Sequence, residues 1–455
     1  MNMQRIFEKV AKVVSPIPSE LAAEKQFAAG LIEQLEKNLP THCKVSFVGS
    51  AARDTGLRGD RDIDLFVAFP REMNEEKIVK KTFEAAHKAA AKTKWETHYA
   101  EHPYLQATID GFKVEVIPCF KVEPHSGIKS AVDRSPLHMD YLQKQLTQQQ
   151  RRDVRIMKKL LKVNGIYGAE VEVGGFSGLV CEQLMLKYGS LEKLLREAGK
   201  WIPPIVIDST NTWNAESKNG KAELLHRFKD AKLILIDVID RNRNAAAAIS
   251  PNSLAKFILL AKAFVKKPSE SFFVQLKHSV NPTSLKKVVG RRGTEFLLIT
   301  LKKPDVVDDI LYSQFKRSEK NLYKQLQSSG FHVFGSCDLY ATGQLLFEVE
   351  SSELLKVKQL VGPPAWNSVN VAHFLKGKKA SRGPYLSGEK ICIDVEQRET
   401  DIVEIAKRLL KEEKTGIASH FISPAKKASV SVVKKADKTN GEILAKYLLA
   451  KEEWI

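Results

Sequence analysis

Hydrophobic positions near the start of the chain recur every three to four residues. Ile6, Val10 and Val13 follow this spacing within residues 2–38. Such a period places apolar side chains on one face of a helix, so this segment is predicted to form one or two amphipathic helices. The next apolar run, 44–48, has the length of a short strand.

The pattern then changes to short apolar runs separated by turn residues. It predicts strands at 63–69, 104–109 and 112–117 and a helix at 74–94. The last two strands are separated only by Asp110 and Gly111. An Asp-Gly pair suits a two-residue hairpin turn because both of its positions need a positive φ. Residues 1–150 are therefore predicted to form an α/β domain with a small mixed sheet.

Longer helical stretches dominate from about residue 151, and they predict a mostly helical domain over 151–270. Beyond Pro268 short strands and helices alternate, with a clear strand at 294–301. We therefore expect an α+β region over 271–455. The whole chain is predicted to be a multidomain α+β protein.

Charge adds a partner to this picture. Lys and Arg number 72 against 54 Asp and Glu, a formal net charge of +18. Such an excess favours a polyanionic partner, since cationic side chains neutralise phosphates and release counterions. Basic clusters recur in the third region, at Arg291-Arg292, Lys302-Lys303, 376–379 and Lys434-Lys435. The alternative is a basic protein whose lysines are only solvated.

Other classes of protein are disfavoured. No apolar run reaches eighteen residues, so no transmembrane helix is expected, and the first residues lack the pattern of a signal peptide. The five cysteines lie far apart without a C-x-x-C motif. This spacing argues against a zinc site or a disulfide framework and fits a reducing cytoplasm.

Two acids stand at the start of the second predicted strand with one residue between them. Side chains alternate along a strand, so Asp62 and Asp64 are expected on one face. Asp60 shares the alternation, but Asp62 and Asp64 adjoin the apolar run directly. Neighbouring carboxylates repel each other unless a cation neutralises them, and an all-oxygen site suits Mg²⁺.

Glu115 is a third acid, alone within an apolar strand. It can complete a two-metal arrangement in which one ion activates an attacking 3′ hydroxyl and the other stabilises a leaving pyrophosphate. Each motif alone has a simpler interpretation. Paired acids often mark a solvated strand end, and Glu115 alone can be an exposed strand residue.

A phosphate-binding turn is predicted after the first strand. Gly49 lets the backbone approach a ligand closely, and Ser50 opens a short helix whose N–H groups favour anions. Arg53 lies one turn further on and can neutralise charge. The alternative is an ordinary capped helix.

In this combination, Gly-Ser followed by two acids and a later third acid, the sequence resembles the DNA-polymerase-β nucleotidyltransferase superfamily. Over more of its length it resembles the class I, archaeal-type CCA-adding enzymes, which are tRNA nucleotidyltransferases. The segments that carry this resemblance are 47–67, 99–104, 114–119, 128–134, 164–168, 175–178, 243–246 and 303–309.

The resemblance implies a polymerase-β-like head and template-independent addition of CCA to the 3′ end of tRNA. CTP and ATP would be the substrates, two Mg²⁺ ions the cofactor and pyrophosphate the product. The third acid of this family is commonly Asp, and Glu115 departs from that pattern. The implied site residues are Asp62, Asp64 and Glu115 for catalysis and metal binding, and Gly49, Ser50, Arg53, His138, Lys158, Tyr167 and Arg243 for the nucleotide.

The resemblance also bears on partners. Basic groups of the third region are expected to hold the tRNA acceptor end, and the family is compatible with a homodimer. Two rival functions stay open. A poly(A) polymerase or other terminal transferase would share the catalytic core, and a catalytically inactive RNA-binding protein would keep only the fold.

The helix predicted over 151–163 carries a basic stripe. Arg151, Arg155, Lys158 and Lys162 are spaced by three or four residues and share a face. Most of these charges are expected to be solvated on a surface helix. For Lys158 the resemblance implies instead a contact with the triphosphate.

Overall fold

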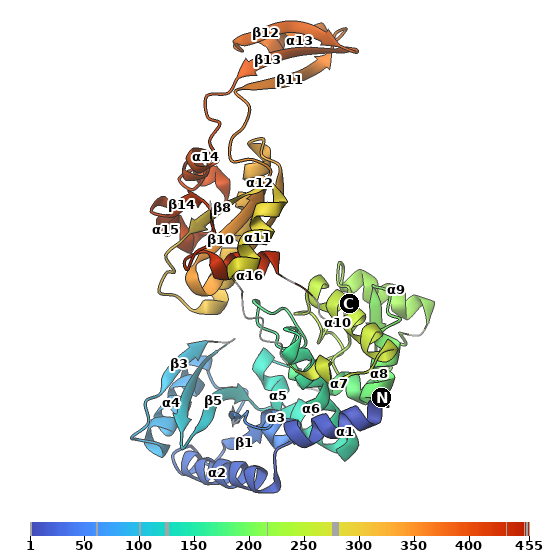
Figure 1. Cartoon of the computed structure of the whole chain (residues 1–455). Coiled ribbons are helices and arrows are strands. Elements are labelled where there is room, and N and C mark those ends of the chain that lie inside the picture. Colours follow the sequence, from blue (N-terminus) through green and yellow to red (C-terminus); the bar gives the residue numbers. More distant parts are fainter. Residues whose placement is uncertain are drawn as a thin grey trace. The chain divides into compact units, whose positions relative to one another are not determined.

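The computed structural model describes residues 2–60, 62–99, 102–122, 127–215, 217–274, 282–433, 435–449, 451 and 454. Arg61, Ala100, Glu101 and Lys434, which belong to the motifs above, lie outside the described residues. The chain divides into two compact units, one of residues 1–276 with 453–455 and one of 277–452 (Figure 1). The division into three domains stays a prediction.

A five-stranded mixed sheet forms the start of the first unit. Its order is β1-β2-β5-β4-β3. The strands are β1 (Lys44–Val48), β2 (Asp62–Phe69), β3 (Glu96–Tyr99), β4 (Pro103–Ile109) and β5 (Phe112–Phe120). Neighbours pair antiparallel except β2 and β5, which are parallel. Helices α2 (Pro18–Lys37) and α4 (Glu75–Ala89) pack together against the sheet and bury Leu35 and Ile78. The predicted mixed sheet is confirmed.

The predicted hairpin turn between β4 and β5 is also confirmed. Asp110 and Gly111 have φ values of 49° and 77°. Ile109 pairs directly with Phe112, so the turn has two residues. The turn therefore sets the register that carries Glu115 into the sheet.

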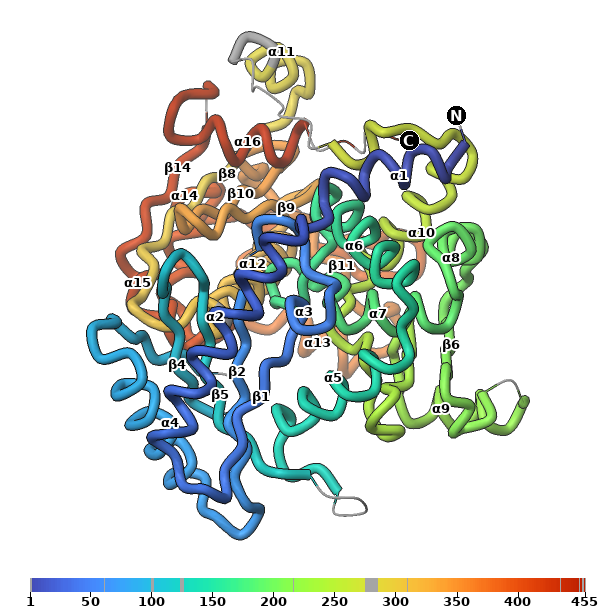
Figure 2. The backbone as a smooth tube through the Cα atoms, turned by 90° about the horizontal axis from the view of Figure 1, so that it is seen from below, coloured from blue at the N-terminus to red at the C-terminus, as the bar shows by residue number. Residues whose placement is uncertain are grey.

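Helix α1 (Met3–Val14) is amphipathic, as expected, but the predicted stripe is wrong at one position. Ile6 and Val10 are buried, whereas Val13 is 69% exposed and Val14 is buried in its place. The reason is the helical period. Val14 lies four residues, about one turn, beyond Val10. Val13 points about 100° away from Val14. This face packs against α6 (Figure 2).

The middle of the chain is mostly helical, as predicted. Its described helices are α6 (Gln148–Val163), α7 (Gly178–Tyr188), α8 (Leu191–Ala198), α9 (Lys218–Arg227), α10 (Pro251–Lys266) and η2 (Glu270–Phe273). A short parallel pair, β6 (Ile205–Ile207) and β7 (Leu233–Leu235), lies among them. Before them lie α3 (Gly49–Ala52), between β1 and β2, and η1 (Ala131–Asp133) and α5 (Arg134–Gln145), after the sheet. Helices α1, α6, α7, α8 and α10 share one hydrophobic core.

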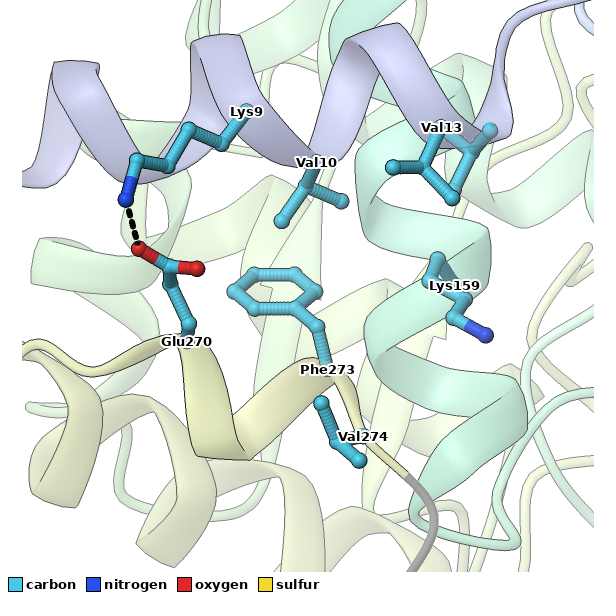
Figure 3. A pocket seen from close by; sticks show the side chains of 8 residues that line it. Lys9, Val10, Val13, Lys159, Glu270, Phe273 and Val274 are labelled. Carbon is cyan, nitrogen blue, oxygen red and sulfur yellow. Dashed lines mark hydrogen bonds and ion pairs between the residues drawn. The ribbon is translucent and has the colours of Figure 1, made fainter.

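A pocket of about 340 Å³ lies between α1, α6 and η2. Figure 3 shows Phe273 and Val10 forming its wall, with Lys9 bound to Glu270 at one side. None of the residues that line it belongs to the predicted site.

The described residues of the second unit form two sheets. The larger has the order β14-β8-β10-β9, with β8 (Glu295–Thr300), β9 (Val333–Leu339), β10 (Gln344–Val349) and β14 (Ser429–Val432). The smaller, β11-β13-β12, comprises β11 (Val357–Pro364), β12 (Ala380–Ser387) and β13 (Lys390–Glu396), and α13 (Ser368–Leu375) packs on β11. Strand β8 confirms the strand predicted at 294–301.

The remaining helices of this unit are α11 (Pro282–Arg292), α12 (Asp308–Ser328), η3 (Tyr340–Thr342), α14 (Ile402–Leu409), η4 (Glu413–Thr415), η5 (Ser419–Phe421), α15 (Ile422–Lys426) and α16 (Gly441–Leu448). Both units mix helices and sheets, so the predicted α+β class is confirmed. Among the described helices, none has the length and apolarity needed to cross a membrane.

Candidate active site

The predicted carboxylates lie on one face of the sheet, where two parallel strands begin. In the pairing of β2 with β5, Asp64 lies directly opposite Glu115, and Asp62 lies opposite Lys113. Residues paired across neighbouring strands point to the same face of a sheet. Asp62, Asp64 and Glu115 therefore share one face, although they come from strands more than forty residues apart in sequence.

Gly49 brings the predicted phosphate turn to the same place. It opens α3 immediately after β1, with a φ of +81°. A Cβ atom added to Gly49 would lie 2.0 Å from Oδ2 of Asp64. The carboxylate thus packs directly against the glycine backbone, a space that no side chain could share. Ser50 follows on the same helix.

The ionised form of Asp64 is disfavoured at this position, by burial and by neighbouring carboxylates. Burial, followed by the charges of Glu115 and Asp62, raises its pKa to about 7. The pKa of Asp62 is also raised, first by desolvation and then by Asp60 and Glu115, against the attraction of Lys113. A cation placed here would relieve this repulsion, and carboxylate oxygens are the donors that Mg²⁺ prefers. The donor set therefore fits such an ion.

Glu115 is nevertheless bound to another side chain. Its Oε1 lies 3.0 Å from Nζ of Lys113, which belongs to the same face of β5. Burial alone would lower the pKa of Lys113, but the hydrogen bond and charge of Glu115 raise it. Within the described part of the chain, no three His, Cys, Asp or Glu side chains converge closely enough to hold an ion. A metal at Asp64 would thus compete with Lys113 for Glu115.

Arg53 lies inside the protein, in a buried ion pair. Its Nε lies 3.0 Å from both carboxylate oxygens of Glu182 on α7. Thr55 donates a 2.5 Å hydrogen bond to the same carboxylate, which is fully buried. Burial would raise the pKa of Glu182, but Arg53 and Lys158 outweigh it and lower that pKa. Glu182 was not predicted from the sequence, where its signal was a lone acid within an apolar helix.

The expectation of a solvated basic stripe on α6 is wrong for Arg155, which is 6% exposed. Its Nε donates to the carbonyl oxygen of Gly56 at 3.0 Å, and its Nη2 donates to that of Asp54 at 2.7 Å. Arg151 donates to the carbonyl oxygen of Arg53. These arginines hold the loop after α3 in place by donating hydrogen bonds to its main-chain carbonyl oxygens. The periodicity of the sequence cannot reveal this role.

Lys158 and Tyr167 come together at the start of α7. Lys158 is 1% exposed, and its Nζ donates to the carbonyl oxygen of Thr55 at 2.9 Å. A Cβ atom added to Gly178 would lie 3.4 Å from both Nζ of Lys158 and the hydroxyl oxygen of Tyr167. Burial lowers the pKa of Lys158 against the attraction of Glu182. Two of the residues implied by resemblance therefore meet beside the loop that follows Ser50.

His138 and Arg243 are joined by a carboxylate that sequence analysis did not single out. The Nε2 of His138, on α5, lies 2.7 Å from Oδ1 of Asp237. Nη1 of Arg243 pairs with the other oxygen, Oδ2. Asp237 is fully buried, whereas the Arg243 side chain is 37% exposed. The signal for Asp237 was an acid directly after an apolar strand.

Three family models together match most of the chain. Residues 29–138 match the model described as nucleotidyltransferase domain. Residues 152–274 match tRNA nucleotidyltransferase, second domain, and residues 292–427 match CCA-adding enzyme, C-terminal domain. The three models follow one another along the chain without overlap.

Curated proteins give the same result. A CCA-adding enzyme of Archaeoglobus fulgidus is 34% identical over 388 residues, covering 84% of each chain. One of Halobacterium salinarum is 35% identical over 385 residues, covering 84% of this chain and 82% of the relative. A solved cytoplasmic RNA terminal U-transferase aligns at 14% identity with a TM-score of 0.48, over 60% of this chain and 98% of its own. That last likeness is too weak to bear on function.

Proposed function

The chain belongs to the CCA-adding enzymes, which add CCA to tRNA by nucleotidyl transfer, and we propose that its site builds this end from CTP and ATP without a template. The observation that carries the proposal is the pairing of Asp64 with Glu115 beside Gly49. It unites the acids of two strands with the turn expected to hold phosphates.

The proposed metal ligands are Asp62, Asp64 and Glu115, and the proposed ions are two Mg²⁺. When bound, these ions would supply charge neutralisation at the attacking oxygen and at the departing pyrophosphate. The 3′ hydroxyl oxygen of tRNA forms a bond to the α-phosphorus, while the bond between that phosphorus and pyrophosphate breaks. The hydroxyl proton leaves towards the carboxylates. For Glu115 to hold an ion, it would have to leave its ion pair with Lys113, because both cations compete for the same carboxylate.

The triphosphate is proposed to lie along Gly49 and Ser50, with Lys158 and Tyr167 nearby. Arg53 takes part from within the protein. A guanidinium offers five N–H donors, and Glu182 engages the one on Nε. The terminal amino groups of Arg53 then face phosphate oxygens. Glu182 holds the guanidinium in place for this contact.

Base selection is proposed for Arg243, with His138 beside it. The pairing edges of cytosine and adenine each present a ring nitrogen with a lone pair. Uracil and guanine present an N–H at the corresponding position. The N–H donors of a guanidinium therefore suit the first two bases and oppose the others. This chemistry allows selection without a nucleic-acid template.

Basic side chains of the second unit are proposed to hold tRNA. Those exposed on and around the β11-β13-β12 sheet are Lys356, Lys358, Lys376, Lys378, Lys379, Arg382 and Lys390. Proteins recognise A-form RNA mainly through its shape and phosphates, so these contacts would be sensitive to salt. A homodimer is a further proposal, to be checked by light scattering of the purified protein.

The proposed function is tested by incorporation of labelled CTP and ATP, separately and together, into tRNA that lacks its 3′ CCA. With Mg²⁺, addition of two C and one A followed by arrest is expected, and EDTA should abolish it. Unlimited addition of A alone would favour a poly(A) polymerase. Binding of tRNA without any incorporation would favour an inactive RNA-binding protein.

Gly49→Ala is expected to lower nucleotide incorporation by about 100-fold or more, because a methyl group would overlap the Asp64 carboxylate at a positive φ. Single-turnover incorporation measures the loss. Gly30→Ala on α2 is the matched control, since an added Cβ there meets no atom within 4 Å. Equal activity of the two variants would contradict the close approach of Gly49 to Asp64.

A further inference from the structure

Asp237 is the shared partner of two residues that the proposed function assigns to the nucleotide. Its Oδ1 lies 2.7 Å from Nε2 of His138, and its Oδ2 pairs with Nη1 of Arg243. We infer that Asp237 is a positioning residue for base selection, which orients the Arg243 guanidinium before a nucleotide arrives. The inference rests on the proposed role of Arg243.

The backbone around this carboxylate is held independently of the ion pair. The main-chain N–H of Asp237 donates to the carbonyl of Arg243 at 3.1 Å, and that of Arg243 donates to the carbonyl of Asp240 at 2.9 Å. Ile239 N donates to Oδ1 of Asp237 at 2.9 Å. Arg134 braces the loop through Asp240 at 2.9 Å. The main freedom left to Arg243 is therefore its own side chain.

An arginine side chain has many rotamers. Binding a base costs conformational entropy when the side chain must be ordered at that moment, and less when it is already ordered. The buried Asp237 carboxylate orders the side chain by engaging one terminal amino group of Arg243. The Arg243 side chain as a whole is 37% exposed. Among the described residues, the rest of its guanidinium has no other side-chain partner. This contact restrains the guanidinium and leaves its remaining N–H donors for a base.

His138 completes the arrangement from the opposite side. The hydrogen bond to its Nε2 occupies the Asp237 oxygen that Arg243 does not use. Burial alone would raise the pKa of Asp237, but the hydrogen bond and charge of His138, together with Arg243, lower it to about 2. The carboxylate is therefore ionised at neutral pH, the form that pairs with Arg243.

Asp237→Asn tests the inference with a small change. The amide oxygen can still accept from Ile239 and His138, so the loop keeps its hydrogen bonds. The amide NH₂ then faces Arg243, and two donors cannot bond to each other. We expect kcat/KM for CTP and ATP to fall about 10- to 100-fold. Discrimination against UTP should fall as well, while the KM for tRNA stays unchanged.

A double-mutant cycle with Arg243→Gln separates positioning from a structural role. If Asp237 acts through Arg243, Asp237→Asn should add little to the loss caused by Arg243→Gln. Asp208→Asn is the matched control. Asp208 is also buried and directly follows a strand of the same region, β6, but its carboxylate accepts from Trp213 N and Thr210 rather than from an arginine. This control should leave UTP discrimination intact.

Each outcome has a distinct meaning. Additive losses in the double mutant, or normal discrimination by Asp237→Asn, would overturn the positioning role. If Arg243→Gln itself leaves discrimination intact, the base-reading role fails and the inference fails with it, although CCA addition by the native protein would stand. Thermal unfolding of each variant checks that the fold is retained, and His138→Gln should weaken discrimination less than Asp237→Asn.

Discussion

Asp64→Ala is expected to lower incorporation of both C and A by about a thousandfold or more while leaving tRNA affinity almost unchanged. Asp64 lies at the centre of the carboxylate group, opposite Glu115 and two residues beyond Asp62. Its removal leaves no carboxylate against the Gly49 backbone. Single-turnover incorporation and a gel-shift titration with tRNA measure the two quantities.

Asp60→Asn is the matched control for this variant. Asp60 shares the alternation of the two acids, but it lies in the loop before β2. Its carboxylate is 3.2 Å from Nζ of Lys162 on α6. Its replacement should change incorporation by less than about threefold, as for other exposed ion pairs. An equal loss of tRNA binding in Asp64→Ala would show that Asp64 supports the fold rather than the reaction.

The stability of Asp64→Asn gives an independent check. The pKa of Asp64 is raised from 3.8 to about 7, so the folded protein disfavours the ionised form. This penalty is absent below the ordinary pKa, grows as pH rises from about 4 to 7, and is complete above 7. In metal-free buffer the variant should therefore have a higher Tm than the native protein at pH 8, and the difference should shrink towards pH 4.

Glu182→Ala is expected to destabilise the first unit by about 3–5 kcal/mol, the range found when one partner of a buried ion pair is removed. The Glu182 carboxylate is fully buried and holds Arg53 Nε and the hydroxyl of Thr55. Without it, Arg53 and the buried Lys158 face each other uncompensated. Urea denaturation measures the free energy of unfolding, and the KM for CTP should rise as Arg53 loses its orientation.

Glu197→Ala provides the comparison for Glu182→Ala. Glu197 lies on the neighbouring helix α8 in an exposed pair with Lys200, at 2.8 Å. Exposed pairs contribute little to stability, so this variant should unfold close to the native protein. Similar denaturation midpoints for both variants would contradict a structural role for the buried pair. Glu182→Gln should fall between them, since an amide keeps the hydrogen bond from Thr55.

Local patterns in the amino-acid sequence predicted much of the first unit. Strand alternation placed Asp62 and Asp64 on one face, and the Asp-Gly pair predicted the hairpin that carries Glu115. These features depend on the geometry of a few consecutive residues, which a sequence records directly. The roles of the remaining site residues, from His138 to Arg243, came only from family resemblance and stay predictions.

Partners distant in the chain were beyond such patterns. The spacing of Arg155 and Lys158 indicated a helix face. The carbonyl groups that accept hydrogen bonds from these side chains belong to a loop about one hundred residues earlier. Likewise, nothing in the sequence indicated that Glu182 and Asp237 bind basic side chains that lie far away in the chain. Periodicity reports which side of an element a residue occupies. Its neighbour there, and hence its charge state and chemistry, depends on how separate elements pack.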